Sequence, residues 1–130
     1  MQDGGHQTTS RRRLCRAEEV PEGGARGFRF EQGADFMAVF VTRKGGELIA
    51  YDNSCPHMGT PLDVRPGRFI TSDRRHLSCG THGARFRFED GYCLAGPCKG
   101  QSLRRLEIAV EAGEIVLLEE PKVQTPEAPA

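Results

Sequence analysis

Two short segments of the chain contain residue types that bind soft or borderline metals. The first is Cys55-Pro56-His57, and the second, after 21 intervening residues, is Cys79-Gly80-Thr81-His82. Turn-forming residues surround both segments, so each is predicted to be a loop at the end of a strand. Two such loops can place two thiolates and two imidazoles around one centre. The candidate ligands are therefore Cys55, His57, Cys79 and His82.

Two kinds of metal centre use this set of donors. One is a tetrahedral structural zinc, and the other is a Rieske [2Fe–2S] cluster, in which two cysteines bind one iron and two histidines bind the other. Paired zinc ligands usually lie two to four residues apart. The Cys-x-His spacing of residues 55 and 57 is tighter. The spacing thus favours the iron–sulfur cluster, and a zinc-stapled interaction module remains an alternative.

Short strands are the elements that must position these loops. Residues 36–42 are apolar on both faces, which predicts a buried strand, and Lys44-Gly45-Gly46 predicts a tight turn into a partner strand. Sustained helical periodicity is absent apart from one turn at residues 17–19. The pattern predicts an all-β fold, a small antiparallel barrel or sandwich. The expected strands are residues 36–42, 47–51, 84–88, 106–110 and 115–118.

Length and composition set further limits. A chain of 130 residues predicts one domain, with an arm at residues 1–13, a folded part at 14–118 and a loose tail at 119–130. The 18 basic and 18 acidic side chains cancel, which argues against a nucleic-acid partner bound through its phosphates. The longest apolar run, Phe36 to Val41, has six residues, far fewer than the ~20 of a membrane helix. We expect a cytoplasmic protein.

The motifs C-x-H-x-G, starting at Cys55, and C-x-x-H-G, starting at Cys79, resemble those of Rieske-type iron–sulfur proteins of the small ferredoxin branch. The resemblance covers nearly the whole predicted folded part. It includes Gly96-Pro97, which matches the proline loop beside the cluster in that family. It implies a Rieske-like fold, in which a small β-barrel or sandwich carries a cluster-binding subdomain of two loops.

The resemblance also implies a cofactor and a role for each ligand. One [2Fe–2S] cluster is expected per chain, with Cys55 and Cys79 on its buried iron and His57 and His82 on its outer iron. High-potential members of the family have a disulfide between the two loops, and Ser and Tyr hydroxyls that donate to the cluster sulfurs. Those positions are Thr60, Thr81, Ala84 and Phe86 in this chain. Fewer donors destabilise the reduced state, so we expect a low reduction potential, roughly −150 mV.

These features predict a one-electron carrier that is not itself a catalyst. The resemblance implies the ferredoxin component of a multicomponent oxygenase, which passes electrons from a flavoprotein reductase to a terminal oxygenase. An alternative is a non-catalytic Rieske-like small subunit of a larger reductase, of the nitrite reductase type. Neither a membrane nor a nucleic acid is an expected partner.

The remaining cysteines have several interpretations. Cys93 and Cys98 flank Gly96-Pro97, and they are either a redox-sensitive disulfide or two reduced thiols that stabilise a turn. Cys15 is expected to be a small buried hydrophobic residue. Charge is also uneven, because residues 53–88 carry six arginines and two aspartates, whereas residues 106–120 carry five glutamates and no basic residue. An arginine-rich cluster end would attract an acidic partner surface, although ordinary solvated strand faces explain the pattern equally well.

Overall fold

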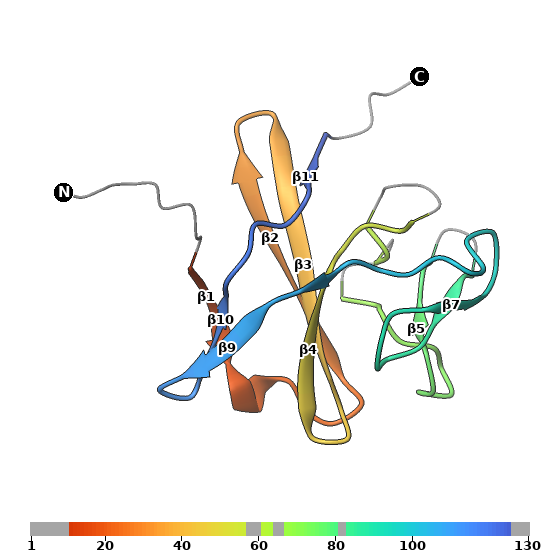
Figure 1. Cartoon of the computed structure of the whole chain (residues 1–130), viewed down its shortest axis with the longest axis horizontal. Coiled ribbons are helices and arrows are strands. Elements are labelled where there is room, and N and C mark those ends of the chain that lie inside the picture. Colours follow the sequence, from red (N-terminus) through yellow and green to blue (C-terminus); the bar gives the residue numbers. More distant parts are fainter. Residues whose placement is uncertain (1–10, 57–60, 64–66, 81–82, 126–130) are drawn as a thin grey trace.

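The computed structural model describes residues 11–56, 61–63, 67–80 and 83–125, which form an antiparallel β-strand body with a smaller lobe at one end (Figure 1). The lobe, residues 53–103, is called the cluster lobe below. Every strand pairing in the described residues is antiparallel, which confirms the predicted all-β fold. The elements are β1 (Arg12–Arg16), the 3₁₀ turn η2 (Ala17–Glu19), β2 (Ala25–Gln32), β3 (Asp35–Lys44), β4 (Glu47–Asp52), β5 (Leu77–Ser78), β6 (Arg85–Phe86), β7 (Cys93–Ala95), β8 (Arg105–Leu106), β9 (Ile108–Glu111), β10 (Glu114–Leu117) and β11 (Val123–Gln124).

Strand β3 is the centre of the body. It pairs with β2 along almost its whole length, and with β4 and β11 at its other edge. Residues 36–42 are all buried, which confirms the strand that their apolar character predicted. The turn into β4 consists of Gly45 and Gly46, both with positive φ (62° and 82°), a conformation that glycine adopts without strain.

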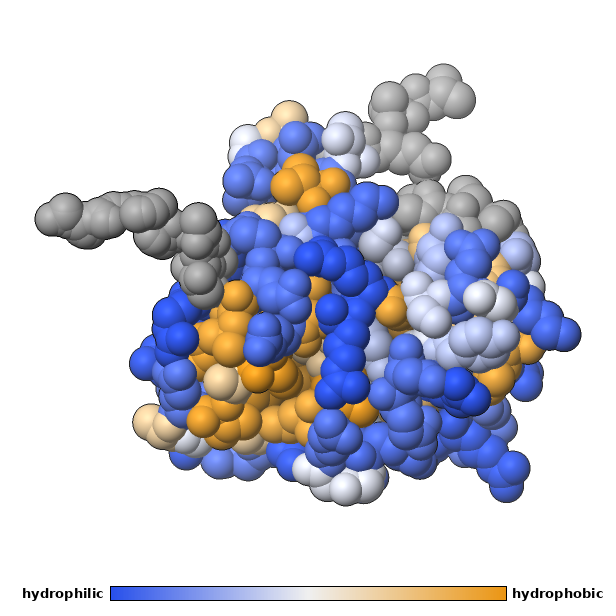
Figure 2. Space-filling view, in the orientation of Figure 1, coloured by the Kyte–Doolittle hydropathy of each residue, from blue (hydrophilic) through white to orange (hydrophobic). Residues whose placement is uncertain are grey.

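The second hairpin of the body is β9–β10, and β10 also pairs with β1. Its turn is Ala112-Gly113. The core between the sheets contains only aliphatic side chains at full burial, namely Val20, Val39, Val41, Ala50, Leu106, Ile115 and Leu117. Apolar side chains also reach the surface on the side of the body around β9 and β10, whereas hydrophilic side chains cover most of the rest of that face (Figure 2).

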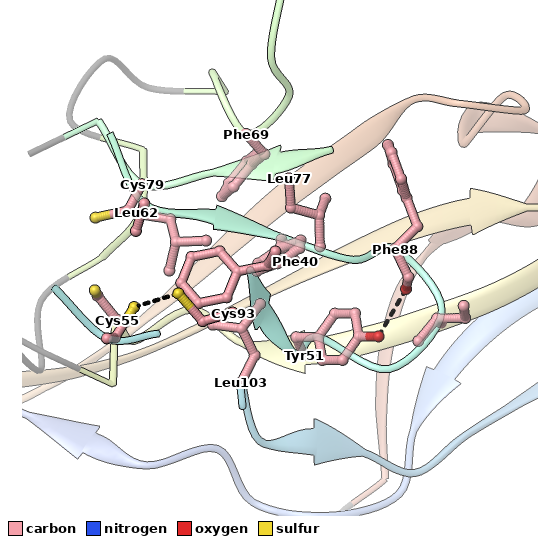
Figure 3. Close-up of a cluster of buried hydrophobic side chains, with 14 residues drawn as sticks. Phe40, Tyr51, Cys55, Leu62, Phe69, Leu77, Cys79, Phe88, Cys93 and Leu103 are labelled. Carbon is pink, nitrogen blue, oxygen red and sulfur yellow. Dashed lines mark hydrogen bonds between the residues drawn. The ribbon is translucent and has the colours of Figure 1, made fainter. Parts of the chain in front are cut away.

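The cluster lobe has a core of its own, which two aromatic residues join to the body. Phe40 of β3 stacks on Phe69 with ring centroids 4.7 Å apart. Tyr51 of β4 donates a hydrogen bond of 2.7 Å to the carbonyl oxygen of Phe88 (Figure 3). Burial raises the pKa of the Tyr51 phenol well above its usual value. Both contacts join the cluster lobe to the sheet that contains β3 and β4.

The structure differs from the sequence-based expectation in several places. Strand β2 was not predicted, and the alternating segment 84–88 is a strand only at residues 85–86. Strand β1 begins at Arg12, and β11 lies at residues 123–124, so ordered chain extends beyond residues 14–118 at both ends. In the described ranges, no helix has the length and apolar character needed to cross a membrane.

Candidate metal centre

The two predicted cysteine ligands lie at one end of the core of the cluster lobe. Cys55 is 2% exposed and Cys79 is 1% exposed, and both belong to the same cluster of buried side chains. Figure 3 shows them at the same end of that cluster. The predicted histidine ligands, His57 and His82, lie outside the described residues. The structure therefore brings together the thiol half of the predicted donor set.

The side chain of Asn53 stabilises the first cysteine loop, which is the segment between β4 and Asp63 that contains Cys55. Its side chain donates 2.9 Å to the Asp63 carboxylate and accepts a 2.7 Å hydrogen bond from the backbone N–H of Leu62. Asn53 is 4% exposed, so these hydrogen bonds form largely away from water. The amide of one residue thus closes the loop that carries Cys55, and Leu62 on its far side is fully buried in the lobe core.

The C-terminal segment supports the same loop from behind. The side chain of Gln124, on β11, donates 2.9 Å to the backbone oxygen of Asn53. The buried carboxylate of Asp52 accepts hydrogen bonds from the backbone N–H of Lys122 and from the Arg104 guanidinium. Because a buried carboxylate needs such partners, Asp52 fixes residues 122–124 against the end of β4.

The second cysteine loop is a tight connection between β5 and β6. The backbone N–H of Cys79 donates 2.9 Å to the oxygen of Ala84, and the N–H of Gly83 donates 3.0 Å to the oxygen of Cys79. One further bond joins the two loops, because the N–H of Gly80 donates 2.9 Å to the oxygen of Leu62. This hydrogen bond thereby joins the segment that follows Cys55 to the segment that follows Cys79.

The Gly96-Pro97 segment packs directly against the second loop. Gly96 has a φ of +102°, and a Cβ added there would lie 2.7 Å from the Cα of Ala84. Only glycine therefore permits this approach. On either side of the segment, Cys93 and Cys98 are fully buried thiols whose sulfurs lie 2.9 Å apart. They are free thiols in the structure, as one of the two interpretations supposed.

Two positions that carry hydroxyls in the high-potential branch are buried here without one. Ala84 is 1% exposed and Phe86 is fully buried, both within the lobe core. The structure thus places apolar side chains at two positions where the resemblance implied that a hydroxyl donor to the cluster sulfurs is missing. The other two departures, Thr60 and Thr81, lie outside the described residues.

Cys15 lies on β1 in the body, and His76 directly precedes β5 in the cluster lobe. Cys15 is partly buried against the core of the body, and burial raises its pKa while Arg26 opposes that effect. His76 is partly buried, and its Nδ1 has no hydrogen-bond partner in the described part of the chain. Sequence reasoning missed the roles of Asn53, Asp63 and Gln124, although the turn residues around Cys55 offered a weak signal for Asn53.

The donors that the structure describes fit an iron–sulfur cluster. Two cysteines, both almost completely buried, lie in loops that hydrogen bonds join, and buried thiols suit the iron that is shielded from solvent. Among residues 11–56, 61–63, 67–80 and 83–125, no three or more His, Cys, Asp or Glu side chains form a group that could hold a metal ion. The described residues therefore offer no rival metal site.

Comparison with known proteins agrees with this geometry. Residues 10–121 match the Rieske [2Fe-2S] domain family, so the chain belongs to the Rieske family and its cofactor is a Rieske-type [2Fe–2S] cluster. The chain is 28% identical over 102 residues to the ferredoxin component of the p-cumate 2,3-dioxygenase system of Pseudomonas putida, covering 78% of this chain and 80% of the relative. It also matches a chain in the structure "Complex of reduced oxygenase and oxidized ferredoxin in carbazole 1,9a-dioxygenase", with a TM-score of 0.64, 26% identity, and coverage of 86% and 95%.

A different branch of the family is equally similar in sequence. The cytochrome b6-f complex iron-sulfur subunit of Chlorobaculum thiosulfatiphilum is 28% identical over 102 residues, which are 78% of this chain. The chain spans half or less of the length of two of the curated relatives that it matches. Family membership thus establishes the fold and the cofactor, whereas partners must be argued from the molecule itself.

Proposed function

We propose that this protein is a one-electron carrier of the Rieske ferredoxin kind, which accepts electrons from a flavoprotein reductase and delivers them to a terminal oxygenase. The observation that carries the proposal is the junction of the two cysteine loops, where the Gly80–Leu62 hydrogen bond holds them together at one end of the molecule. Similarity to a dioxygenase ferredoxin over four fifths of that relative's length supports the oxygenase as the recipient.

In this proposal, Cys55, His57, Cys79 and His82 hold the cluster, and when bound the cluster stores a single electron. The residues of the chain bury the thiolates, orient them and exclude water. Asn53 fixes the first loop, and Leu62 and Phe69 fill the core behind it. We expect a low reduction potential, because Ala84 and Phe86 present no hydroxyl to the cluster sulfurs.

Exposed arginines on the cluster lobe support an acidic partner surface. Within the described part of the chain, the side chains of four arginines are exposed and form no ion pair; these are Arg68, Arg74, Arg75 and Arg85. The glutamates of the body differ, since Glu111, Glu114 and Glu119 pair with arginines of the same chain. The exposed arginines without an ion pair in the described residues therefore all lie on the lobe that carries the cysteines, where they would accelerate encounter with an acidic partner.

Four single variants test the ligand assignment, and two matched controls accompany them. Cys55→Ala, His57→Ala, Cys79→Ala and His82→Ala should each abolish the visible absorbance of the purified holoprotein. Cys15→Ala and His76→Ala remove the same side chains away from the site and should keep it. A colourless wild-type protein with zinc by elemental analysis would exclude the cluster-carrier proposal.

The carrier role itself is tested with the holoprotein. Protein-film voltammetry should give a midpoint near the low end of the Rieske range, roughly −150 mV, and a midpoint above about +100 mV would contradict it. Reduction by a reduced nicotinamide through a flavoprotein reductase, and reoxidation by a terminal oxygenase, should be fast and should slow at high ionic strength. Co-elution with a large reductase subunit as a permanent complex would instead support the small-subunit alternative.

A further inference from the structure

A hairpin of the cluster lobe, residues 69–78, leads directly into the second cysteine loop. The backbone N–H of Ser78 donates 2.7 Å to the oxygen of Phe69, which closes the hairpin immediately before Cys79. Phe69 and Leu77 are buried, and they lie together in the core of the lobe (Figure 3). The hairpin is therefore anchored in the same core that contains Cys79.

A hollow of about 300 Å³ lies against this hairpin, lined by residues 67–72 and Arg74. We call it the arginine hollow. Arg68 and Arg74 are exposed, and neither guanidinium forms an ion pair or a hydrogen bond with another residue in the described part of the chain. One water molecule takes up about 30 Å³ in the liquid. The hollow thus has room for a side chain of another molecule, beside two positive charges without a described partner.

Arg74 has a backbone conformation that favours glycine. Its φ is +61°, in the left-handed region, which costs free energy for a residue with a Cβ. The N–H of Arg74 donates 2.8 Å to the oxygen of Thr71, a contact that a glycine would form equally well. Within the described residues, no polar contact of the guanidinium offsets the cost. An arginine retained at such a position indicates a role toward another molecule.

Acidic groups of the chain itself are engaged elsewhere. The Asp73 carboxylate, in the same turn, accepts 2.6 Å from the Thr71 hydroxyl and 3.1 Å from the backbone N–H of Arg75. On the body, Glu111 and Glu114 pair with arginines of the same chain, so a second copy would present these carboxylates already neutralised. A different protein with free carboxylates is therefore the favoured occupant of the hollow.

We propose that Arg68 and Arg74 bind an Asp or Glu side chain of a redox partner, whose carboxylate enters the arginine hollow. Guanidinium groups form charge-assisted, bidentate hydrogen bonds with carboxylates, and two of them line the same space. Arg75 and Arg85 do not line it, so they contribute only longer-range attraction. The inference rests on the proposed carrier function, because that function identifies the partner as a redox protein.

An acidic probe tests the site directly. A synthetic tetrapeptide of alternating glutamate and aspartate, with blocked ends, is titrated into the holoprotein while NMR records the arginine Nε–H signals. The signals of Arg68 and Arg74 should shift and saturate together. Arg68→Gln and Arg74→Gln should each weaken peptide binding about fivefold. Arg75→Gln is the matched control, since it removes the same charge from the adjacent position outside the hollow, and should weaken binding by less than about twofold.

Arg74→Gly separates a binding role from a structural one. Glycine relieves the strain of the positive φ and removes the guanidinium. The midpoint of urea unfolding should therefore stay at or above that of the wild type, while peptide binding weakens as much as in Arg74→Gln. A lower unfolding midpoint together with unchanged peptide binding would show that the Arg74 side chain serves the fold, and would overturn the proposal.

The remaining outcomes are equally decisive. Equal weakening by Arg74→Gln and Arg75→Gln would show diffuse attraction without a site. Saturation of the two arginine signals by inorganic phosphate, with no response to the peptide, would assign the hollow to a small anion and overturn the protein partner. A wild type that holds zinc and no cluster would end the proposed function and the redox identity of the partner. A holoprotein that accepts electrons, yet binds the peptide equally with and without Arg74, would overturn only the role of the hollow.

Discussion

The body and the cluster lobe are held together by different kinds of interaction. The body consists of long ladders, such as the eight paired positions of β2 and β3, around an aliphatic core. In the cluster lobe the strands have two or three residues each. Single contacts replace ladders there, including the Asn53 amide bonds, the close approach of Gly96 to Ala84 and the sulfur contact between Cys93 and Cys98.

This difference predicts different responses to substitution. A ladder with an aliphatic core distributes its stabilisation over many weak contacts, so one conservative change in it has a modest effect. In a lobe that is held by single contacts, the loss of one contact can displace a whole loop. Single-residue changes in the lobe should therefore affect cluster retention, whereas comparable changes in the body should affect only the free energy of unfolding.

The largest effect is expected at Gly96. Gly96→Ala places a Cβ 2.7 Å from the Ala84 backbone, so the proline loop must move away from the second cysteine loop. Overpacking and positive φ together should cost about 3 kcal/mol and accelerate cluster loss. Gly100→Ala is the matched control, because its φ of +92° is similar and nothing lies within 4 Å of its added Cβ. Thermal unfolding measures the stability of the two variants, and the decay of visible absorbance measures their rate of cluster loss. Equal effects in Gly96→Ala and Gly100→Ala would show that the close approach to Ala84 is unimportant.

Asn53→Ala should have the second largest effect, because it removes the side-chain hydrogen bonds that stabilise the first cysteine loop. The buried N–H of Leu62 loses its acceptor, which should cost about 2 kcal/mol and increase the rate of cluster release into a chelator. Thr42→Val makes a comparable change in the body, where the buried hydroxyl donates 2.6 Å to the oxygen of Gly24. That variant should lose about 1 kcal/mol and release its cluster at the wild-type rate. Parallel loss of stability and cluster in both variants would contradict the separation of the two regions.

Tyr51→Phe tests the junction between the two regions. It removes the hydrogen bond to the Phe88 oxygen and should cost about 1 kcal/mol at neutral pH. Because burial raises the folded-state pKa of Tyr51 above the unfolded value of about 10, the folded state holds this proton more tightly. The resulting stability is fully present below pH ~10 and is lost as pH rises above it. Denaturant titrations from pH 7 to 11 should show a steeper alkaline decline for the wild type than for Tyr51→Phe. Tyr92→Phe, an exposed position, should behave like the wild type.

The two regions also differ in how much of them the sequence could predict. Hairpin β3–β4 was predictable because its apolar run and Gly45-Gly46 turn are local signals. Motif spacing selected Cys55 and Cys79 as candidate ligands, and the structure buries both in the core of the cluster lobe. Strand β2 was missed because its apolar residues Phe28 and Phe30 are only partly buried among charged neighbours.

Contacts between distant residues account for the rest of what the sequence could not predict. The Gln124 side chain donates to the backbone of Asn53, 71 positions earlier, and the backbone N–H of Lys122 donates to the carboxylate of Asp52, 70 positions earlier. A polar residue in a tail has no local pattern that indicates such a partner. For the same reason, spacing alone could not choose between thiols and a disulfide for Cys93 and Cys98. Local elements follow from composition and periodicity, whereas the contacts that shape the site depend on the assembled fold.

The smallest expected effect is a gain in stability within the body. Ala112 has a φ of +53° in the two-residue turn between β9 and β10, a conformation that costs a residue with a Cβ about 1–2 kcal/mol. Ala112→Gly removes that strain, and the greater freedom of glycine in the unfolded chain offsets part of the gain, leaving about 0.5 kcal/mol. Ala109→Gly, in the adjacent strand opposite Val116, should instead destabilise the protein by about 1 kcal/mol. Urea titration of both variants should therefore give shifts of opposite sign, with unchanged cluster retention. A change in cluster retention in either variant would show that the body and the cluster lobe are coupled more closely than their contacts indicate.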